Sequence, residues 1–193
     1  MSRFKRIPLE HAPRLINHGP TILVTSRSKD NKKHNVMTAA WSTPVEFEPP
    51  RLLVLINKES LTRKLIMESG VFAVCVPTAS FVDQTYAVGS TTGQEIDKFQ
   101  RFNIARIQSP ELDIPVIEDG CVAWLECRLI PEKSVQEKYD TFFGEILSAS
   151  ADPTIFYNGR YHFTDANKSS HTIHHLGGGN FVLSNDLIAA KEL

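Results

Sequence analysis

Our prediction of the fold is decided by the segment His34-Asn35-Val36-Met37-Thr38-Ala39-Ala40-Trp41. The β-branched run 21–26 before it predicts a strand, and the polar residues 29–33 predict a turn, so the segment returns as the second arm of a hairpin. Its small residues allow a flat ligand to approach the backbone, and its tryptophan offers an apolar wall. The segment is therefore a candidate wall of a cofactor site, and the alternative is an ordinary strand that ends in a core tryptophan.

A second polar segment follows, Asn57-Lys58-Glu59-Ser60-Leu61-Thr62. Ser60 is a candidate N-cap, residues 61–66 repeat at helical spacing, and Gly70 stands where such a helix would end. Hydroxyl groups at the start of a helix hold anions well. A flat ring beside one segment and a phosphate beside the other make FMN the candidate cofactor. The alternative is that Ser60 acts only as a cap.

Strands dominate the rest of the chain. Residues 51–57, 71–76 and 121–130 predict apolar strands, and 134–148 predict a further strand with a bulge or bend. Residues 80–103 predict one or two helices, interrupted by the loop 89–93. Asn158-Gly159 lies between aromatic arms and predicts a hairpin. We expect a mainly β fold, an antiparallel barrel with short peripheral helices, because closure removes exposed sheet edges.

Length and charge narrow the class of protein. The chain has 193 residues, which predicts one domain over 1–193, and its net charge of −1 gives no electrostatic footprint for nucleic acid. No apolar run approaches the ~20 residues that span a bilayer, and residues 1–6 are charged with no apolar stretch behind them. We therefore expect no nucleic acid partner, no membrane span, no signal peptide and a cytoplasmic location.

Three cysteines are present, Cys75, Cys121 and Cys127. The last two lie six residues apart in one predicted strand, so their Cα atoms would be ~20 Å apart, too far for a disulfide. We expect three reduced thiols packed as small apolar groups.

Two further patterns compete for the role of functional site. His171, His174 and His175 have the spacing of one helical face, which in a helix would suit zinc or iron, but no carboxylate or cysteine completes the set. We therefore assign no metal ligands and keep a non-catalytic flavin- or metal-binding protein as the alternative of another class. The loop 89–93 is rich in glycine and hydroxyl groups, and with Lys98 it is a candidate phosphate contact, whereas the alternative is a solvated loop.

Taken together, these segments resemble the flavin reductase-like family, whose fold is the FMN-binding split barrel, and in particular its flavoredoxin and ferric-reductase branch. The resemblance is carried by residues 35–41, by Glu48-Pro49-Pro50 before an apolar strand, by Ser60-Leu61-Thr62, by 72–77, by 89–99 and by 174–179. Cys75 stands where the family often has asparagine. The match follows the order of most of the chain.

The resemblance implies non-covalent FMN at a homodimer interface and electron transfer or NAD(P)H-linked flavin reduction. We expect electrons to pass from a reduced nicotinamide or a redox protein to a flavin, a ferric complex or a protein. The alternative enzyme is a reductase that supplies reduced FMN to a monooxygenase. We expect the flavin to supply the chemistry and no catalytic residue of the protein to be essential. The residues that this resemblance places around the cofactor are Asn35, Met37, Thr38, Ala39, Ala40, Trp41, Asn57, Ser60, Thr62, Lys98 and His175.

Overall fold

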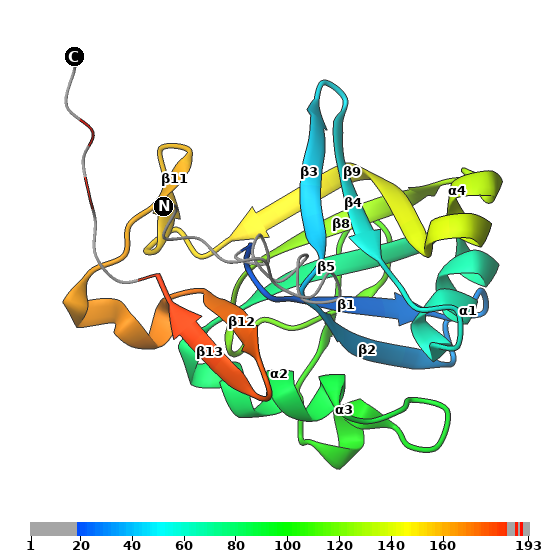
Figure 1. Cartoon of the computed structure of the whole chain (residues 1–193), viewed down its shortest axis with the longest axis horizontal. Helices are drawn as coiled ribbons and strands as arrows, with labels where there is room; N and C mark the ends of the chain where they lie inside the picture. The colour runs from blue at the N-terminus through cyan, green and yellow to red at the C-terminus, as the bar shows by residue number, and fades with distance from the viewer. Residues whose placement is uncertain (1–18, 185–187, 189, 191–193) are drawn as a thin grey trace, which may run out of the picture.

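A seven-stranded antiparallel sheet forms the body of the protein in the computed structural model, which describes residues 19–184, 188 and 190 (Figure 1). The strand order is β2-β1-β5-β8-β9-β4-β3. The sheet contains β1 (Ile22–Arg27), β2 (His34–Ala39), β3 (Ser42–Phe47), β4 (Pro50–Leu55), β5 (Val71–Pro77), β8 (Cys121–Ile130) and β9 (Thr141–Ala151). The predicted mainly β fold with short helices is confirmed.

Short elements surround this sheet. The helices are α1 (Leu61–Ser69), α2 (Val82–Gly89), α3 (Lys98–Arg101) and α4 (Lys133–Tyr139), with 3-10 turns η2 (Ala79–Phe81) and η3 (Asp165–Ser170). Three small two-stranded sheets pair β6 (Ile107–Gln108) with β7 (Pro115–Val116), β10 (Phe156–Tyr157) with β11 (Arg160–Tyr161), and β12 (Ile173–Gly177) with β13 (Asn180–Leu183). No helix in the described part of the chain is long and apolar enough to cross a membrane.

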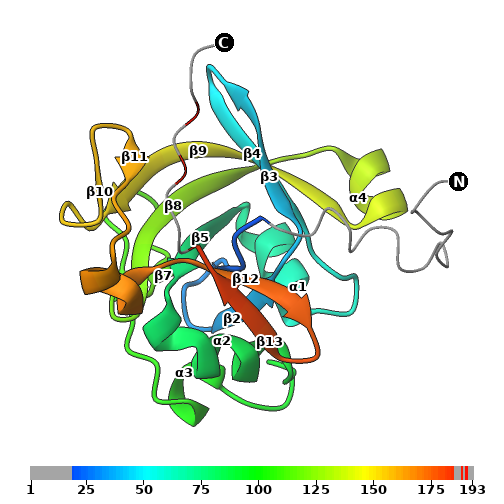
Figure 2. The same cartoon turned by 60° about the vertical axis from the view of Figure 1, so that its left-hand side comes forward.

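The core shows why the sheet curls. One cluster of buried side chains takes residues from β1, β2, β4, β5, β8 and β9, among them Val24, Val54 and Phe142. These strands surround a common interior, as Figures 1 and 2 show. A second cluster, which includes Leu23, Ala73 and residues of 99–117, lies on the other face of the sheet under α2 and α3. Burying both faces gives the curved sheet two apolar layers.

Several local predictions are confirmed. Residues 22–27 and 34–39 pair as a hairpin, and α1 begins at a Ser60 cap and ends at Gly70 with φ +74°. Asn158 and Gly159 both have positive φ, as a tight hairpin turn requires.

One prediction of secondary structure is wrong in part: of the strand predicted over 134–148, residues 141–148 lie in β9, whereas 134–139 lie in α4. Residues 133–139 form α4 rather than strand, because this segment of polar helix formers buries only Gln136 and ends at Asp140 in the left-handed conformation. His174 and His175 lie on the strand β12, so the helix that a metal site at these histidines would need does not form in this segment. The alternation of side chains along a strand therefore directs His174 and His175 to opposite faces.

Candidate functional site around strand β2

Strand β2 lies at one end of the main sheet, where it pairs with β1 alone among the described strands of that sheet. Its outer edge therefore carries backbone N–H and C=O groups that the main sheet does not use. The loop 89–93 packs closely against the strand, because a Cβ atom at Gly93 would lie 2.1 Å from the side-chain oxygen of Asn35. Glycine at this position lets the loop lie directly on β2.

A cavity of about 370 Å³, called here the lysine cavity, lies at the start of β2 and of α1. Its lining residues are Lys33, Lys58, Glu59, Ser60, Leu61, Lys64 and Gln94. Three lysines and one glutamate line the cavity, and the Lys58 ammonium also lies 3.8 Å from the Asp140 carboxylate, so the lining has a net positive charge. The first turn of α1 adds N–H groups and the positive end of the helix dipole. This arrangement suits a phosphate group.

Ser60 has a fixed role at this helix start. Its hydroxyl oxygen accepts from the Arg63 N–H at 3.2 Å, and its O–H donates to the Asn57 carbonyl at 2.8 Å. The Asn57 side-chain oxygen accepts from the Glu59 N–H at 2.8 Å. Asn57 and Ser60 therefore shape the loop around the cavity, and Ser60 also lines it.

A second cavity, of about 230 Å³, lies at the other end of β2 and is called here the hairpin cavity. It is lined by Thr21, Thr38, Ala40, Thr85, Tyr86, Gly89, Ser90, His175 and Phe181. The last two residues belong to the β12–β13 hairpin, which lies beside α2 in both views (Figures 1 and 2). Aromatic, small and hydroxyl-bearing walls suit a flat ring with polar edges.

The two cavities are joined by the length of β2. Lys33 precedes the strand and Ala40 follows it, so seven residue steps of an extended chain separate them by ~23 Å at most. An elongated ligand with an anionic end and a flat end would therefore lie along this strand.

The structure divides the predicted site residues into two groups. Thr38, Ala40, Ser60 and His175 line a cavity. Ala39 is instead part of the barrel core, and Met37 packs against that core. Trp41 is 46% exposed, and it lines neither cavity.

Asn35 and Thr62 are both buried and bind each other. The Asn35 amide donates to the Thr62 hydroxyl oxygen at 2.8 Å. This bond ties β2 to the first turn of α1. The pair therefore sets the relative position of the two elements that carry the lysine cavity.

Lys98 also has a structural contact. The residue is 4% exposed, and its ammonium group donates to the carbonyl of Val88 near the end of α2 at 2.7 Å. Burial lowers the pKa of Lys98 to about 8. A cation suits the negative end of a helix, so Lys98 holds α2 in place, and it does not line the lysine cavity.

The histidines do not gather into one site. The ring of His171 is buried and bonds Thr164 and Asn167 at 3.0 Å each, whereas the ring of His174 lies 3.4 Å from the Thr172 hydroxyl. No group of three or more potential metal ligands occurs among the described residues. The spacing that suggested a metal site depended on a helix that is absent from this described segment.

Sequence reasoning missed several residues of the two cavities. The sequence places Lys33 in a polar turn and gives no site role to Lys64, Gln94, Tyr86 or Phe181, yet all five line a cavity. Lys64 follows Ser60 by one helical turn, and this spacing was the available signal. Phe181 had no signal of its own, because only the β12–β13 pairing brings it to His175, with ring centroids 5.1 Å apart.

The chain is similar to several known proteins. A family model described as "Flavin reductase like domain" matches residues 15–165. The protein YddH of Escherichia coli K12, described as uncharacterized, is 47% identical over 98% of this chain and 100% of its own. An FMN-binding domain of a flavin reductases-like enzyme from Shewanella baltica has 37% identity and a TM-score of 0.85, with 96% of each chain covered.

More distant relatives extend this picture. A ferric-chelate reductase (NAD(P)H) of Archaeoglobus fulgidus is 23% identical over 78% of this chain and 87% of its own. The flavoredoxin of Desulfovibrio vulgaris shares the fold, with a TM-score of 0.76 and 21% identity over 98% of this chain and 96% of its own.

Proposed function

Since this chain belongs to the flavin reductase-like family, we propose that it is an FMN-dependent oxidoreductase that passes electrons from a reduced nicotinamide to a flavin, a ferric complex or a protein. The predicted family, its split-barrel fold and FMN as its cofactor are confirmed by these similarities. The nicotinamide donor is supported by the NAD(P)H-dependent relative. A redox protein as donor, and release of reduced FMN to a monooxygenase, are the alternatives.

The lysine cavity is the observation that carries the proposal. We assign the FMN phosphate to Lys33, Lys58 and Lys64 at the start of α1, and the isoalloxazine ring to the hairpin cavity beside Thr38, Ala40 and His175. The ribityl chain then follows the edge of β2. The residues fit the group, because the positive cavity takes its anionic end and the cavity between α2 and the hairpin takes its flat end.

The flavin, when bound, supplies the acceptance and donation of electrons. The chain's own residues hold and orient it. The lysines neutralise the phosphate, Ala40 leaves room for the ring, and Tyr86 with the β12–β13 hairpin covers the hairpin cavity. We also propose a homodimer, with the partner closing part of the site.

The test compares FMN with riboflavin, which lacks the phosphate. We expect the triple variant Lys33→Ala, Lys58→Ala, Lys64→Ala to weaken FMN binding by about 100-fold or more, because contacts of charged groups contribute ~1.5–3 kcal/mol each. Riboflavin binding should change little. Fluorescence titration measures both dissociation constants.

Lys32→Ala is the matched control. It removes a neighbouring lysine whose side chain is 86% exposed and lies 3.8 Å from Asp30. Equal losses for FMN and riboflavin in the triple variant, or equal losses of FMN in both variants, would place the phosphate elsewhere. Anaerobic reduction of the bound flavin by NADH and by NADPH then tests the electron donor.

A further inference from the structure

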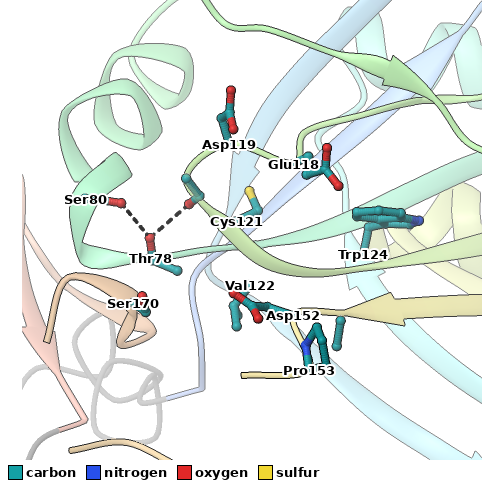
Figure 3. Close-up of a pocket in the computed structure, with 12 residues that line it drawn as sticks. Thr78, Ser80, Glu118, Asp119, Cys121, Val122, Trp124, Asp152, Pro153 and Ser170 are labelled. Atoms are coloured by element: carbon teal, nitrogen blue, oxygen red, sulfur yellow. Dashed lines mark hydrogen bonds between the residues drawn. The ribbon is translucent and has the colours of Figure 1, made fainter. Parts of the chain in front are cut away.

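A third cavity, of about 430 Å³ and called here the acidic cavity, shares no lining residue with the two cavities at β2. It lies where β5 ends and β8 begins. Acidic side chains line it from two loops, Glu118 and Asp119 from one and Asp152 from the other, and Trp124 forms a wall. Figure 3 shows the sulfur of Cys121 among these side chains.

The thiol of Cys121 has a second thiol beside it. Cys75 lies on β5 and Cys121 on the neighbouring β8, and both pack in the cluster under α2 and α3. The Cys75 thiol is near enough to raise the pKa of the Cys121 thiol. Cys75 is fully buried, whereas Cys121 is partly exposed and lines the cavity. The Cys121 thiol is therefore accessible to a small molecule in the cavity, whereas the Cys75 thiol is not.

The strand register places the pair diagonally across the ladder. Cys75 lies opposite Trp124 and Cys121 opposite Pro77, with an irregular step between the two positions. The Gly120 that precedes Cys121 has φ +83°. At this step β8 carries one extra residue, Val122, between the partners of Val76 and Pro77.

We propose that Cys75 and Cys121 form a redox-active thiol pair, which a hydroperoxide that enters the acidic cavity converts reversibly into a disulfide. The sulfur of Cys121 attacks a peroxide oxygen, the O–O bond breaks, and a sulfenic acid forms with loss of water or an alcohol. The sulfur of Cys75 then attacks the sulfenic sulfur, the S–O bond breaks, and water leaves. The two thiols lose two electrons and two protons in total, and the hydroperoxide is reduced by the same two electrons.

Cys127 provides a control within the same strand. It packs in the other core cluster, on the opposite face of the sheet, and burial raises its pKa above the ordinary range. Its sulfur lies 3.9 Å from the Leu125 carbonyl. Cys127 does not line the acidic cavity. Nonspecific oxidation of buried thiols would also modify Cys127, whereas oxidation through the acidic cavity would leave Cys127 reduced.

The reaction has a predictable dependence on pH. The pKa of the Cys121 thiol is raised well above its ordinary value by the neighbouring Cys75 thiol and by burial. The charged groups that line the same cavity, Glu118, Asp119 and Asp152, are all acidic. Because the thiolate is the nucleophile, the rate of oxidation should rise about tenfold per pH unit through the neutral range.

The experiment treats the purified, flavin-loaded protein with hydrogen peroxide and maps its thiols by alkylation and mass spectrometry. We expect the number of free thiols to fall from three to one, with a crosslinked peptide pair that contains Cys75 and Cys121 and with Cys127 still alkylated. Dithiothreitol should restore all three. The same crosslink should form in Cys127→Ser.

In Cys75→Ser the reaction should stop at a sulfenic acid on Cys121, which dimedone traps. If the Cys75→Ser variant does not fold, the thiol mapping of the unchanged protein still tests the proposal. Retention of all three thiols at peroxide concentrations that oxidise free cysteine would overturn the proposal. Loss of Cys127 as fast as Cys121 would overturn it as well.

Discussion

Thr62 is a single residue at a helix start whose hydroxyl has a structural role, and we expect that it does not contact the phosphate. It is buried and accepts from the Asn35 amide. We expect Thr62→Val to lower the free energy of unfolding by about 1–3 kcal/mol, because the buried amide loses its acceptor. The dissociation constant for FMN should change only a few-fold. Urea titration and flavin fluorescence measure the two effects.

Thr43→Val is the control for this substitution, since the Thr43 hydroxyl is exposed and bonds only the neighbouring Pro44 carbonyl in the described contacts. Its stability should change by less than about 0.5 kcal/mol. If the Thr62→Val variant were as stable as the unchanged protein but no longer bound FMN, Thr62 would be a direct contact of the phosphate.

Lys98 makes a prediction about pH. Its folded-state pKa of about 8 lies below the ordinary lysine value of 10.5, because burial disfavours the charged form. The unfolded chain therefore binds more protons between these two values, and stability from this group rises with pH across that window. We expect the stability of the unchanged protein relative to Lys98→Met to rise between pH 7 and pH 10, by at most about 3 kcal/mol. A pH-independent difference in urea titrations would contradict this.

The β12–β13 hairpin carries a prediction at the scale of one element. Gly178 and Gly179 both have positive φ, but only at Gly179 would a Cβ atom meet the Tyr86 ring, at 3.1 Å. We expect Gly179→Ala to push the hairpin from α2 and to raise quenching of flavin fluorescence by iodide. Gly178→Ala carries a similar backbone cost, since its Cβ would meet only the Asn180 amide at 3.7 Å. Equal quenching in both variants would show that the β12–β13 hairpin does not cover the flavin ring.

The elements also show what the sequence could predict. Helix α1 has a cap, an apolar repeat and a terminal glycine, and the first hairpin has a polar turn between apolar arms; each signal is local, and both elements were predicted. Helix α4 lacks an apolar face, so its residues were predicted as strand, and the helical spacing of the histidines on β12 is a coincidence that carries no structural signal. The lysine cavity was found in part, through Ser60 and Lys58. Lys33 and Gln94 join it only through contacts between distant segments, which no single stretch of sequence encodes.

At the scale of the whole molecule, the β3–β4 hairpin projects from the barrel in Figure 1. Phe47 on this hairpin is fully exposed, and Trp41 and Val45 are exposed by 46% and 44%. We expect light scattering to give a dimer mass, and Phe47→Glu to shift the equilibrium toward monomer and to release flavin. Ile107→Glu, which changes a 45% exposed residue on β6, is the control. A monomer that retains its full flavin content would contradict the proposed dimer.

The position of β2 at the end of the main sheet has a consequence for the behaviour of the protein in solution. The outer edge of β2 is unpaired among the described strands of the main sheet, and an unpaired strand edge is a template on which other chains add strand by strand, which leads to aggregation. A cofactor that lies along β2 would shield that edge. FMN would then have a second role besides electron transfer, because it would protect the protein from aggregation. The supply of flavin would set how much of the protein stays unaggregated.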